Sequence, residues 1–486
     1  MTERTPGEAA LLDELLQSAC IFSGGRLDFP AKWRRAERIR VHHPELATAS
    51  IHAAVVCGEL EQVERMLADD PALVGARGGP QSWEPLLFAC YGRLPNRRFD
   101  EHSVAIVRAL LDAGADAGTS FIHPDGEVRF FALTGVIGHG ELAQPEHPRA
   151  DELARLLLAR GADPNDSQAL YDTHLVGDDP KWLELLLAHG LGPRDRINWH
   201  ADPDEVAKAG PILDYLVAQA ATNGHERRLR CLLAHGADAN ARSSYTDHSG
   251  YQAALIAGRR DLAELLVAHG AEPLPVEGVD AFVAACNAND RELAERMLAE
   301  QPDYLDHVDA LVDAVMHRNR DAVMLLLELG MDPNRPGRHC HVALHAACED
   351  RELVEALLAH GADPRARCFG GSAAGWARHA GNLAMARILA ERSHELLDAV
   401  LAGHLALVAT LLLEDPGVVH SRGPDGSTAM HVLPDDPAVA RPIVDALLAH
   451  GIDLDAVDHE GLDAIARLEH DGLDELAAVI ERARSR

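Results

Sequence analysis

The chain repeats an apolar helical pattern that ends, copy after copy, in glycine. In residues 353–364 (LVEALLAHGADP), Val354, Leu357 and Leu358 recur at the i, i+3, i+4 spacing that places side chains on one face of a helix. The glycine then accepts the left-handed backbone conformation that closes a helix. Eight stretches share this ending, and their closing glycines are Gly114, Gly161, Gly190, Gly236, Gly270, Gly330, Gly361 and Gly451. The pattern predicts an amphipathic helix before each of them.

Other copies of the same helix end in proline. The separations between successive closing glycines are 47, 29, 46, 34, 60, 31 and 90 residues, and the two longest correspond to two and three periods. The copies that fill these gaps end near Pro302 and Pro416, and an earlier one ends near Pro71. Because proline cannot continue a helix, it is an alternative stop signal. A copy near residues 386–399 has neither signal, and residues 38–50 are a candidate N-terminal copy.

A shorter, alanine-rich helix precedes the leucine-rich one. Residues 341–361 (HVALHAACEDRELVEALLAHG) and 282–298 (FVAACNANDRELAERML) show both helices with a tight turn between them. The small alanine face lets the first helix pack closely against its neighbours, and the leucine stripe covers the outer side of the stack. The sequence therefore predicts an all-α fold made of a row of two-helix units.

This two-helix unit resembles the ankyrin repeat, whose period is about 33 residues. The residues that carry the resemblance are Gly426, Ser427, Thr428, Ala429, Met430 and His431 in one copy, and Ala343, Leu344, His345, Ala346, Ala347, Gly361, Ala362 and Asp363 in another. The resemblance implies an ankyrin-repeat solenoid of about 12 repeats, similar to bacterial members of the family with many repeats and N-terminal insertions. The Thr-Pro pair of the family pattern is mostly missing, so the helix starts should be less regular.

Three parts are predicted along the chain. Residues 1–49 are expected to form N-terminal capping helices or a degenerate repeat, residues 50–460 the repeat array, and residues 461–486 a C-terminal capping helix, because an exposed terminal repeat needs one polar face. The separations of 47 and 46 residues exceed one period, and the extra residues fall near 118–150 and 192–226. Insertions in solenoids map to loops on one face, which is often the binding face.

Composition narrows the partner and the compartment. Hydrophobic residues make up 47% of the chain but aromatic residues only 4%, which favours close-packed helices. The formal net charge of −32 opposes binding to nucleic acid and favours a partner that is not acidic. The eight cysteines form no CxxC pair, the N-terminus is acidic where a signal peptide would be basic, and no apolar stretch reaches the roughly 20 residues of a membrane helix. We therefore expect a cytoplasmic protein with no membrane partner.

The scarce aromatic residues, with histidines beside them, indicate a candidate binding surface. They fall in predicted hairpins, in the insertions or at the starts of first helices, segments that line the concave groove in ankyrin proteins. Aromatic side chains are frequent anchors of protein interfaces. The alternative is that they pack gaps between repeats, and for Trp83, Trp199 and Tyr245 the two interpretations have equal weight. The predicted partner-binding residues are Trp83, Tyr91, Phe121, His123, Tyr171, His174, Trp199, His200, Tyr245 and His248.

Most other histidines are expected to be structural. Five belong to the phrase Ala-His-Gly in the last turn of a helix, where partial positive charge suits the helix dipole: His189, His235, His269, His360 and His450. The resemblance implies that His52, His345 and His431 form hydrogen bonds where the hairpin meets the first helix. His339, His341 and His345 are weak candidates for a transition-metal site, the alternative being a hairpin with hydrogen-bonding imidazoles.

Two further classes of function stay open beside binding. Histidines adjoin carboxylates in or near the insertions, and such pairs could act in acid–base catalysis or bind a metal: His123 with Asp125, Asp172 with His174, His200 with Asp202, and Asp247 with His248. The chain has no P-loop, G-x-S-x-G or H-E-x-x-H motif, so we assign no catalytic residue and no cofactor.

The leading prediction is a non-catalytic scaffold or adaptor that recognises a protein or peptide through the concave groove. The first alternative is a metal- or His/Asp-dependent enzyme that acts on a peptide or small molecule held near the insertions. The second alternative is a purely structural subunit of a larger assembly.

Overall fold

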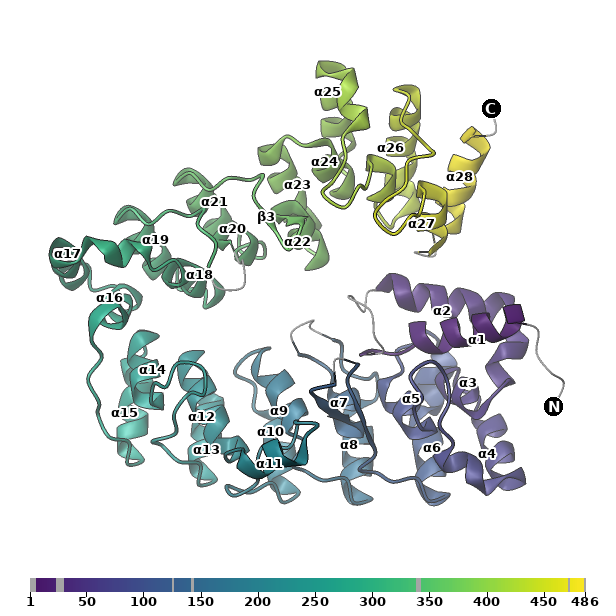
Figure 1. Ribbon diagram of the computed structural model, residues 1–486, viewed down its shortest axis with the longest axis horizontal. Coiled ribbons are helices and arrows are strands. Elements are labelled where there is room, and N and C mark those ends of the chain that lie inside the picture. The colour runs from purple at the N-terminus through teal and green to yellow at the C-terminus, as the bar shows by residue number, and fades with distance from the viewer. Residues whose placement is uncertain are drawn as a thin grey trace. The chain divides into compact units, whose positions relative to one another are not determined.

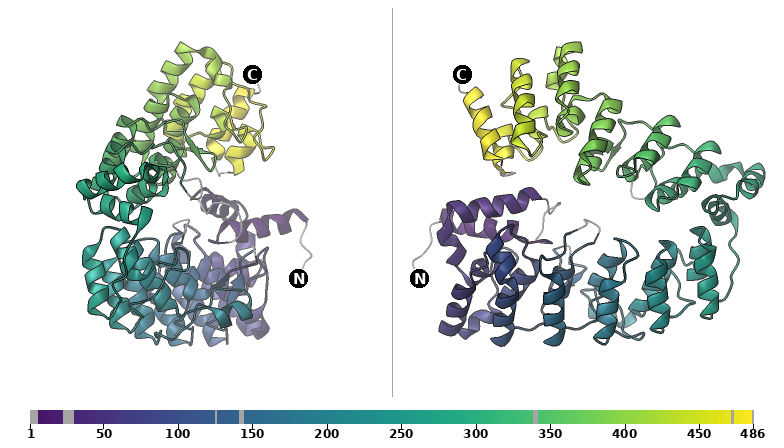
Figure 2. Two further views of the ribbon diagram at one scale, coloured as in Figure 1. Left: turned by 60° about the vertical axis from the view of Figure 1, so that its left-hand side comes forward. Right: turned by 180° about the vertical axis from the view of Figure 1, so that it is seen from behind.

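The structure, a computed structural model, describes residues 6–22, 30–124, 126–140, 144–337, 342–470 and 473–484. The chain divides into two compact units, which are described separately. The first unit is made of Met1–Ala254 with Arg260–Leu274, and the second of Leu255–Arg259 with Pro275–Arg486. Within each unit, pairs of helices joined by tight turns follow one another and lie side by side (Figure 1, Figure 2).

The first unit begins with α1 (Pro6–Ser18), which packs against α2 (Pro30–His42) and α3. Its helix pairs are α3 (Ile51–Val56) and α4 (Leu60–Asp69), α5 (Pro85–Tyr91) and α6 (Arg97–Asp112), α7 (Ala132–Ile137) and α8 (Ala150–Ala159), α9 (Ser167–His174) and α10 (Lys181–Ala188), α12 (Ile212–Thr222) and α13 (Glu226–Ala234), and α14 (Gly250–Ile256) and α15 (Arg260–Ala268). The first insertion adds β1 (Ser120–Ile122) and β2 (Arg129–Phe131), and the second adds α11 (Pro203–Lys208). Both insertions thus lie before the first helix of a pair.

The second unit repeats the same plan. Its helix pairs are α16 (Gly278–Asn287) and α17 (Arg291–Glu300), α18 (Asp309–Met316) and α19 (Arg320–Glu328), α20 (Ala343–Ala346) and α21 (Arg351–Ala359), α22 (Ala373–His379) and α23 (Leu383–Ser393), α24 (Leu396–Leu401) and α25 (Leu405–Glu414), the 3-10 turn η6 (Ala429–His431) and α26 (Pro437–Ala449), and α27 (Ala464–His470) and α28 (Asp474–Arg484). Apart from the ribbon β1–β2 and the two-residue strands β3 (Arg367–Cys368) and β4 (Gly371–Ser372), the described elements are helical. The predicted all-α ankyrin-repeat solenoid is confirmed.

Alanine and leucine build the cores as the pattern predicted. In the second unit one continuous cluster contains Ala343 and Ala347 of the α20 region together with Leu353 and Leu357 of α21. All four side chains are at most 2% exposed. Each two-helix unit can bury its leucine stripe only against the next one, so stability depends on contacts between neighbours.

The closing glycines adopt the conformation that their position requires. Their φ angles run from +76° at Gly451 to +112° at Gly190, within the region that side chains disfavour. Beyond them the backbone bonds back to the helix: at Gly361, for example, Ala362 N donates to Leu357 O at 3.0 Å. The glycine stop signals are therefore confirmed.

The prolines act differently from the glycines. Pro71, Pro302 and Pro416 each open a 3-10 turn, and the helix before each of them stops two residues earlier. These turns are η2 (Pro71–Gly75), η3 (Pro302–Asp306) and η5 (Pro416–His420), and Pro44 opens η1 (Pro44–Thr48) in the same way. The fixed φ of proline suits the first position of a helical turn, where its missing N–H costs no hydrogen bond.

The copy near residues 386–399 ends in a strained residue. Helix α23 is followed by His394 with φ +55° and ψ +36°, the left-handed conformation that glycine adopts in the other copies. Its ring Nε2 lies 3.0 Å from Glu414 Oε2, and both side chains are about half exposed. This copy has no stop signal in its sequence because a histidine occupies the glycine position.

Replacing His394 with glycine is expected to stabilise the second unit by about 0.5–1 kcal/mol. Relief of left-handed strain outweighs the extra freedom that glycine gives the unfolded chain, and the exposed ion pair to Glu414 contributes little. Thermal unfolding should show a higher Tm. The matched control is Gly361→Ala, where φ is +90° and no atom lies within 4 Å of the added Cβ. Strain alone should lower its stability by about 1 kcal/mol, and equal shifts in the two variants would contradict this explanation.

The histidines of the Ala-His-Gly phrase complete the helix ends. In all five, ring Nδ1 lies 2.8–2.9 Å from the carbonyl oxygen four residues earlier, as His360 Nδ1 does from Ala356 O. A ring N–H in that place donates to a carbonyl of the last helical turn, and at His235 and His360 this carbonyl also accepts the backbone N–H of the histidine. These histidines therefore form a row of helix caps and do not converge on a site.

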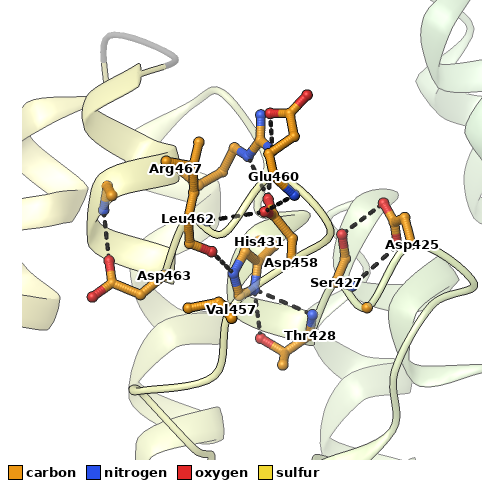
Figure 3. Close-up of polar contacts among 12 residues, drawn as sticks. Asp425, Ser427, Thr428, His431, Val457, Asp458, Glu460, Leu462, Asp463 and Arg467 are labelled. Carbon is orange, nitrogen blue, oxygen red and sulfur yellow. Dashed lines mark hydrogen bonds and ion pairs between the residues drawn. The ribbon is translucent and has the colours of Figure 1, made fainter.

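Two of the three histidines implied by the resemblance, His52 and His431, have hydrogen-bond partners. His52 Nε2 lies 2.8 Å from Ala76 O. His431 Nδ1 lies 2.8 Å from Thr428 Oγ1, and its Nε2 lies 3.1 Å from Leu462 O in the following hairpin (Figure 3). The His431 ring therefore connects one repeat to the next. His345 occupies the same position in α20 and is fully buried, which lowers its pKa.

Asparagine side chains also tie each repeat to its neighbour. Asn334 Nδ2 donates to Gly361 O at 2.9 Å, and Asn334 Oδ1 accepts from Asp363 N at 2.6 Å. Asn240 forms the same pair of bonds with Gly270 O and Glu272 N in the first unit. Because the partners lie about one period apart, these bonds fix the register between successive repeats.

Helix α28 covers the end of the second unit. Leu476 and Ile480 are buried in one cluster with Ile443 and Leu447 of α26. The turn before α27 is held by Arg467, whose guanidinium pairs with the buried Asp458 (Figure 3). The described part of residues 461–486 therefore supplies the apolar face that α26 needs on that side.

Candidate functional site

Backbone hydrogen bonds join the two insertions of the first unit. In the first insertion, β1 and β2 pair antiparallel with Phe121 opposite Phe130. Residues 199–201 of the second insertion pair with the start of β2: Arg129 N donates to Trp199 O at 2.6 Å, and Ala201 N donates to Glu127 O at 2.9 Å. We call these three segments the insertion ribbon. The ribbon brings together candidate residues whose positions relative to one another could not be predicted from the sequence.

Short polar side chains fix the second insertion to the start of α9. Ser167 N donates to Asn198 Oδ1 at 3.1 Å, and Asn198 N donates to Ser167 Oγ at 3.1 Å. Asn165 Nδ2 also donates to Arg196 O at 2.8 Å. Because Ser167 is the first residue of α9, these bonds hold the backbone of Trp199 next to the same helix that carries Tyr171 and His174.

One group of aromatic side chains packs against the insertion ribbon. This buried aromatic cluster consists of Trp83, Phe88, Tyr91 and Phe130, which are buried, together with Phe22 and the predicted binding residue Phe121, which are partly buried. The ring centroid of Trp83 lies 4.4 Å from that of Phe121 and 5.1 Å from that of Tyr91. Tyr91 Oη donates to Phe131 O at 2.6 Å, and burial raises the pKa of its phenol.

The buried aromatic cluster contains two of the predicted partner-binding residues, Trp83 and Tyr91. Trp83 is 3% exposed and Tyr91 is completely buried. In this conformation neither side chain can touch a partner, so the packing alternative describes their place in the fold. They act on any binding surface indirectly, because they position β1 and β2.

A second group of rings is partly exposed. This Trp199 platform consists of Tyr171, His174, Trp199, Tyr215 and Tyr245. The centroid of Trp199 lies 5.8 Å from that of Tyr171 and 5.3 Å from that of Tyr215, with the ring planes at 69° and 79°. Tyr215 continues the row to Tyr245 at 6.4 Å and 67°. The structure thus places four of the predicted binding residues in one contiguous row.

The Trp199 platform has a buried base and an exposed upper side. His174 and Tyr215 are 4% and 8% exposed, Tyr171 and Trp199 are partly buried, and Tyr245 is 68% exposed. The hydroxyl groups of Tyr215 and Tyr245 lie 3.3 Å apart, within hydrogen-bond distance. An exposed aromatic ring that rests on buried ones is already ordered, so a partner loses little entropy by contacting it.

The other predicted histidines lie at the edges of these two groups. The centroid of the His200 ring lies 6.0 Å from that of Trp199, and the centroid of the His123 ring lies 5.5 Å from that of Phe130. His248 lies in the same hairpin as Tyr245, in which Arg242 pairs with Ser249. None of these three is part of the ring row itself.

A buried carboxylate holds the helices that support the platform. Asp166 caps α9 by accepting from Ala169 N at 3.0 Å, and Thr134 Oγ1 of α7 donates to it at 2.9 Å. Burial raises the pKa of Asp166 to about 6. Further along α9, Gln168 Nε2 donates to the buried Asp172 Oδ1 at 2.8 Å. These bonds fix α9 against α7 and so fix the position of Tyr171.

His174 makes the stability of the first unit depend on pH. Its Nδ1 lies 2.5 Å from Tyr171 O, and burial lowers its pKa to about 4. The unfolded chain binds a proton near pH 6.5, which the folded chain resists. The stabilising effect of a neutral His174 is therefore complete above pH 6.5 and is lost as the pH falls towards 4.

Between pH 7 and pH 5, the free energy of unfolding of the wild-type protein should fall by about 2 kcal/mol more than that of His174→Gln. Asp166 has the opposite sign, because its raised pKa favours the folded state at low pH, but it is common to both proteins and cancels in the comparison. Urea unfolding at several pH values measures the difference. A difference that does not change with pH would show that His174 titrates normally in the folded protein.

The remaining carboxylates of the His–carboxylate pairs have local structural roles. Asp202 caps α11 by accepting from Asp204 N at 2.9 Å. Asp247 Oδ1 lies 2.9 Å from Arg242 Nε, which lowers the pKa of Asp247. Asp125 lies outside the described residues. The described His–carboxylate pairs do not meet around one point. They therefore form no joint acid–base site that would support the enzyme alternative.

Of the three candidate metal ligands, one lies among the described residues. His339 and His341 lie outside the described residues, as do Arg338 and Cys340. The third candidate, His345, is buried with its ring centroid 6.0 Å from that of Trp376. Among the residues that the structure describes, no three His, Cys, Asp or Glu side chains are grouped as metal ligands. The metal site stays an untested prediction.

Sequence reasoning missed the residues that connect the two aromatic groups. Phe130 stacks on Phe121 and Tyr215 lies between Trp199 and Tyr245, but neither was among the predicted residues. A signal was present: Tyr215 lies near the start of α12 as Tyr171 does in α9. Aligning the first helices of successive units would have placed both tyrosines on the same face.

In the part of the chain that the structure describes, no helix combines the length and the apolar composition that crossing a membrane requires.

Comparison with known proteins gives matches confined to short stretches of the chain. A family model described as Ankyrin repeat matches residues 340–368. Two rice proteins named BTB/POZ domain and ankyrin repeat-containing protein, NH5.1 and NH5.2, are each 43% identical over 91 residues, which cover 18% of this chain and 18% of each relative. A putative ankyrin repeat protein of fowlpox virus, FPV115, is 26% identical over 106 residues, 21% of this chain and 19% of its own length. The chain thus spans less than a fifth of these relatives.

Proposed function

The chain belongs to the ankyrin-repeat proteins, and from that premise we propose that it is a non-catalytic scaffold that binds a protein or peptide at the Trp199 platform. Ankyrin repeats generally mediate contacts between proteins. The observation that carries the proposal is the partly exposed row of Tyr171, Trp199 and Tyr245, in which the second insertion supplies Trp199. Such pre-ordered aromatic rings are suited to anchoring a partner. Binding at this surface needs no cofactor and no catalytic group.

The charge of the chain supports a partner that is not acidic. The net charge of −32 attracts basic segments at long range and repels phosphate backbones. A reducing compartment such as the cytoplasm suits the cysteines: those described are free thiols, and burial raises the pKa of Cys57, Cys90 and Cys286 to about 12. Such thiols have no tendency to form disulfides.

Two exposed aromatic residues provide a matched test of the proposed function. Tyr245 is 68% exposed and belongs to the platform, whereas Phe369 is 69% exposed and lies in the β3–β4 turn of the second unit. Tyr245→Ala and Trp199→Ala should reduce capture of the partner about tenfold or more in a pull-down, while Phe369→Ala should leave it unchanged. Thermal unfolding verifies that all three variants remain folded. Unchanged capture by the platform variants would place the binding surface elsewhere.

A further inference from the structure

We infer that the Trp199 platform recognises a cationic side chain, the guanidinium of arginine or the ammonium of lysine, in a peptide segment of its partner. The inference rests on the proposed function and adds the chemistry of the group that is bound. It draws on two independent observations, the angles between the rings and the distribution of charge around them.

The ring geometry of the platform suits a cation. Trp199 stands at 69° to Tyr171 and at 79° to Tyr215, so the ring planes meet like the walls of a corner. A cation in such a corner is attracted by the negative faces of more than one ring at once, and tryptophan provides the strongest such interaction. The hydrogen-bond contact between Tyr215 and Tyr245 holds the adjoining wall in place. Edge-to-face angles of this kind are also usual between packed aromatic rings, so the charge around the platform decides for a cation.

Exposed carboxylates lie close to this corner. Asp202 and Asp204 are exposed and follow Trp199 within five residues; three residues of extended chain reach at most roughly 10 Å, which bounds the distance from Trp199 to Asp202. Glu127, also exposed, accepts through its carbonyl from Ala201 N on the insertion ribbon. These carboxylates attract a cation over the distance at which charges act in physiological salt.

The cations of the same segments already have partners within the chain. Arg196 Nη1 donates to Ala209 O at 2.7 Å, Lys208 pairs with Glu205 at 2.8 Å, and Arg242 pairs with Asp247 at 2.9 Å. His174 is uncharged at neutral pH, since burial lowers its pKa to about 4. Arg228, whose charge also lowers the pKa of His174, is buried and donates to Asp179 O at 3.1 Å. With these cations paired inside the chain, the exposed side of the corner is suited to a cation supplied from outside.

The test compares peptides that differ only in charge. Three fluorescein-labelled peptides share a Gly-Ser background and carry three arginines, three citrullines or three glutamates; citrulline has the shape of arginine without its charge. Fluorescence anisotropy with the full-length protein should show the arginine peptide binding about tenfold more tightly than the citrulline peptide, and no binding of the glutamate peptide. Trp199→Ala should remove about tenfold of the arginine affinity, and Trp199→Phe, which keeps an aromatic face, should recover part of it.

Two variants separate the platform from the general acidity of the chain. Asp202→Asn with Asp204→Asn should weaken arginine binding and reduce its dependence on salt, whereas Glu61→Gln with Glu64→Gln, exposed on α4, should not. Equal affinity for arginine and citrulline peptides, both lost in Trp199→Ala, would overturn the inference and leave the proposed function intact. Arginine binding that Trp199→Ala does not change would overturn the inference, and the pull-down would then decide the proposed function separately. Tetramethylammonium that binds as tightly as the peptide would instead indicate a free small cation as the ligand.

Discussion

Substituting Trp83 by alanine is expected to lower the free energy of unfolding by about 3–5 kcal/mol. The indole is 3% exposed and contacts Phe88, Tyr91 and Phe121 with centroid distances of 5.5, 5.1 and 4.4 Å. Removing it leaves a cavity that its neighbours cannot fill without moving β1. Urea unfolding of the full-length protein, followed by far-UV circular dichroism, measures the loss.

The matched control for Trp83 is the other tryptophan of the insertion region. Trp199 is partly exposed, so Trp199→Ala should cost at most about 1 kcal/mol while it removes partner binding. Trp83→Phe should recover more than half of the loss, because it refills much of the cavity. Equal destabilisation by Trp83→Ala and Trp199→Ala would contradict the division into a buried aromatic cluster and an exposed platform.

Substituting Arg228 by alanine is expected to destabilise the first unit by about 2–4 kcal/mol. Arg228 lies in α13 and is 1% exposed, the largest fully buried side chain described. Its guanidinium donates to Asp179 O at 3.1 Å and lies 3.4 Å from Thr173 Oγ1 of α9. Alanine removes both hydrogen bonds and opens a cavity between α9 and α13.

Arg227, the residue before Arg228, provides the control for this second prediction. Its side chain is 66% exposed and pairs with Asp179 at 3.4 Å, so Arg227→Ala should cost less than about 0.5 kcal/mol. Arg228→Met should cost about half as much as Arg228→Ala, since the methionine stem refills the cavity and no charge needs to be buried. Urea unfolding measures the free energy of unfolding of the three variants. A large effect of Arg227→Ala would show that the shared aspartate, and not burial, supplies the stability.

The repeat could be predicted because its signals are local. Gly361 closes a helix whatever surrounds it, because only its own φ of +90° matters, and Pro302 opens the 3-10 turn after α17 because its own ring fixes φ. The Ala-His-Gly histidines bond to a carbonyl four residues earlier, a distance that the helix itself sets. His394 marks the limit of this reasoning: neighbouring structure holds it in a conformation that its residue type disfavours.

The side chains of the candidate site could be predicted from the sequence, but their arrangement in space could not. Ten candidate side chains were identified by residue type and by their place in hairpins and insertions, and the sequence could not divide them. Trp83 and Trp199 are chemically identical, yet one is enclosed by Phe88, Tyr91 and Phe121 and the other lies at the edge of α9. Burial of a side chain depends on which segments pack on it, and that is a property of the whole fold.

The sequence by itself determined the two-helix unit, its stop signals and the chain's acidic character, because each depends on residues within about one helical turn or on a simple sum over the chain. Only the tertiary structure decided that Val128 pairs with His200, and that Tyr171, Trp199, Tyr215 and Tyr245 form one row. That pairing joins two insertions through backbone hydrogen bonds, which any residue can form, so no residue type announces it.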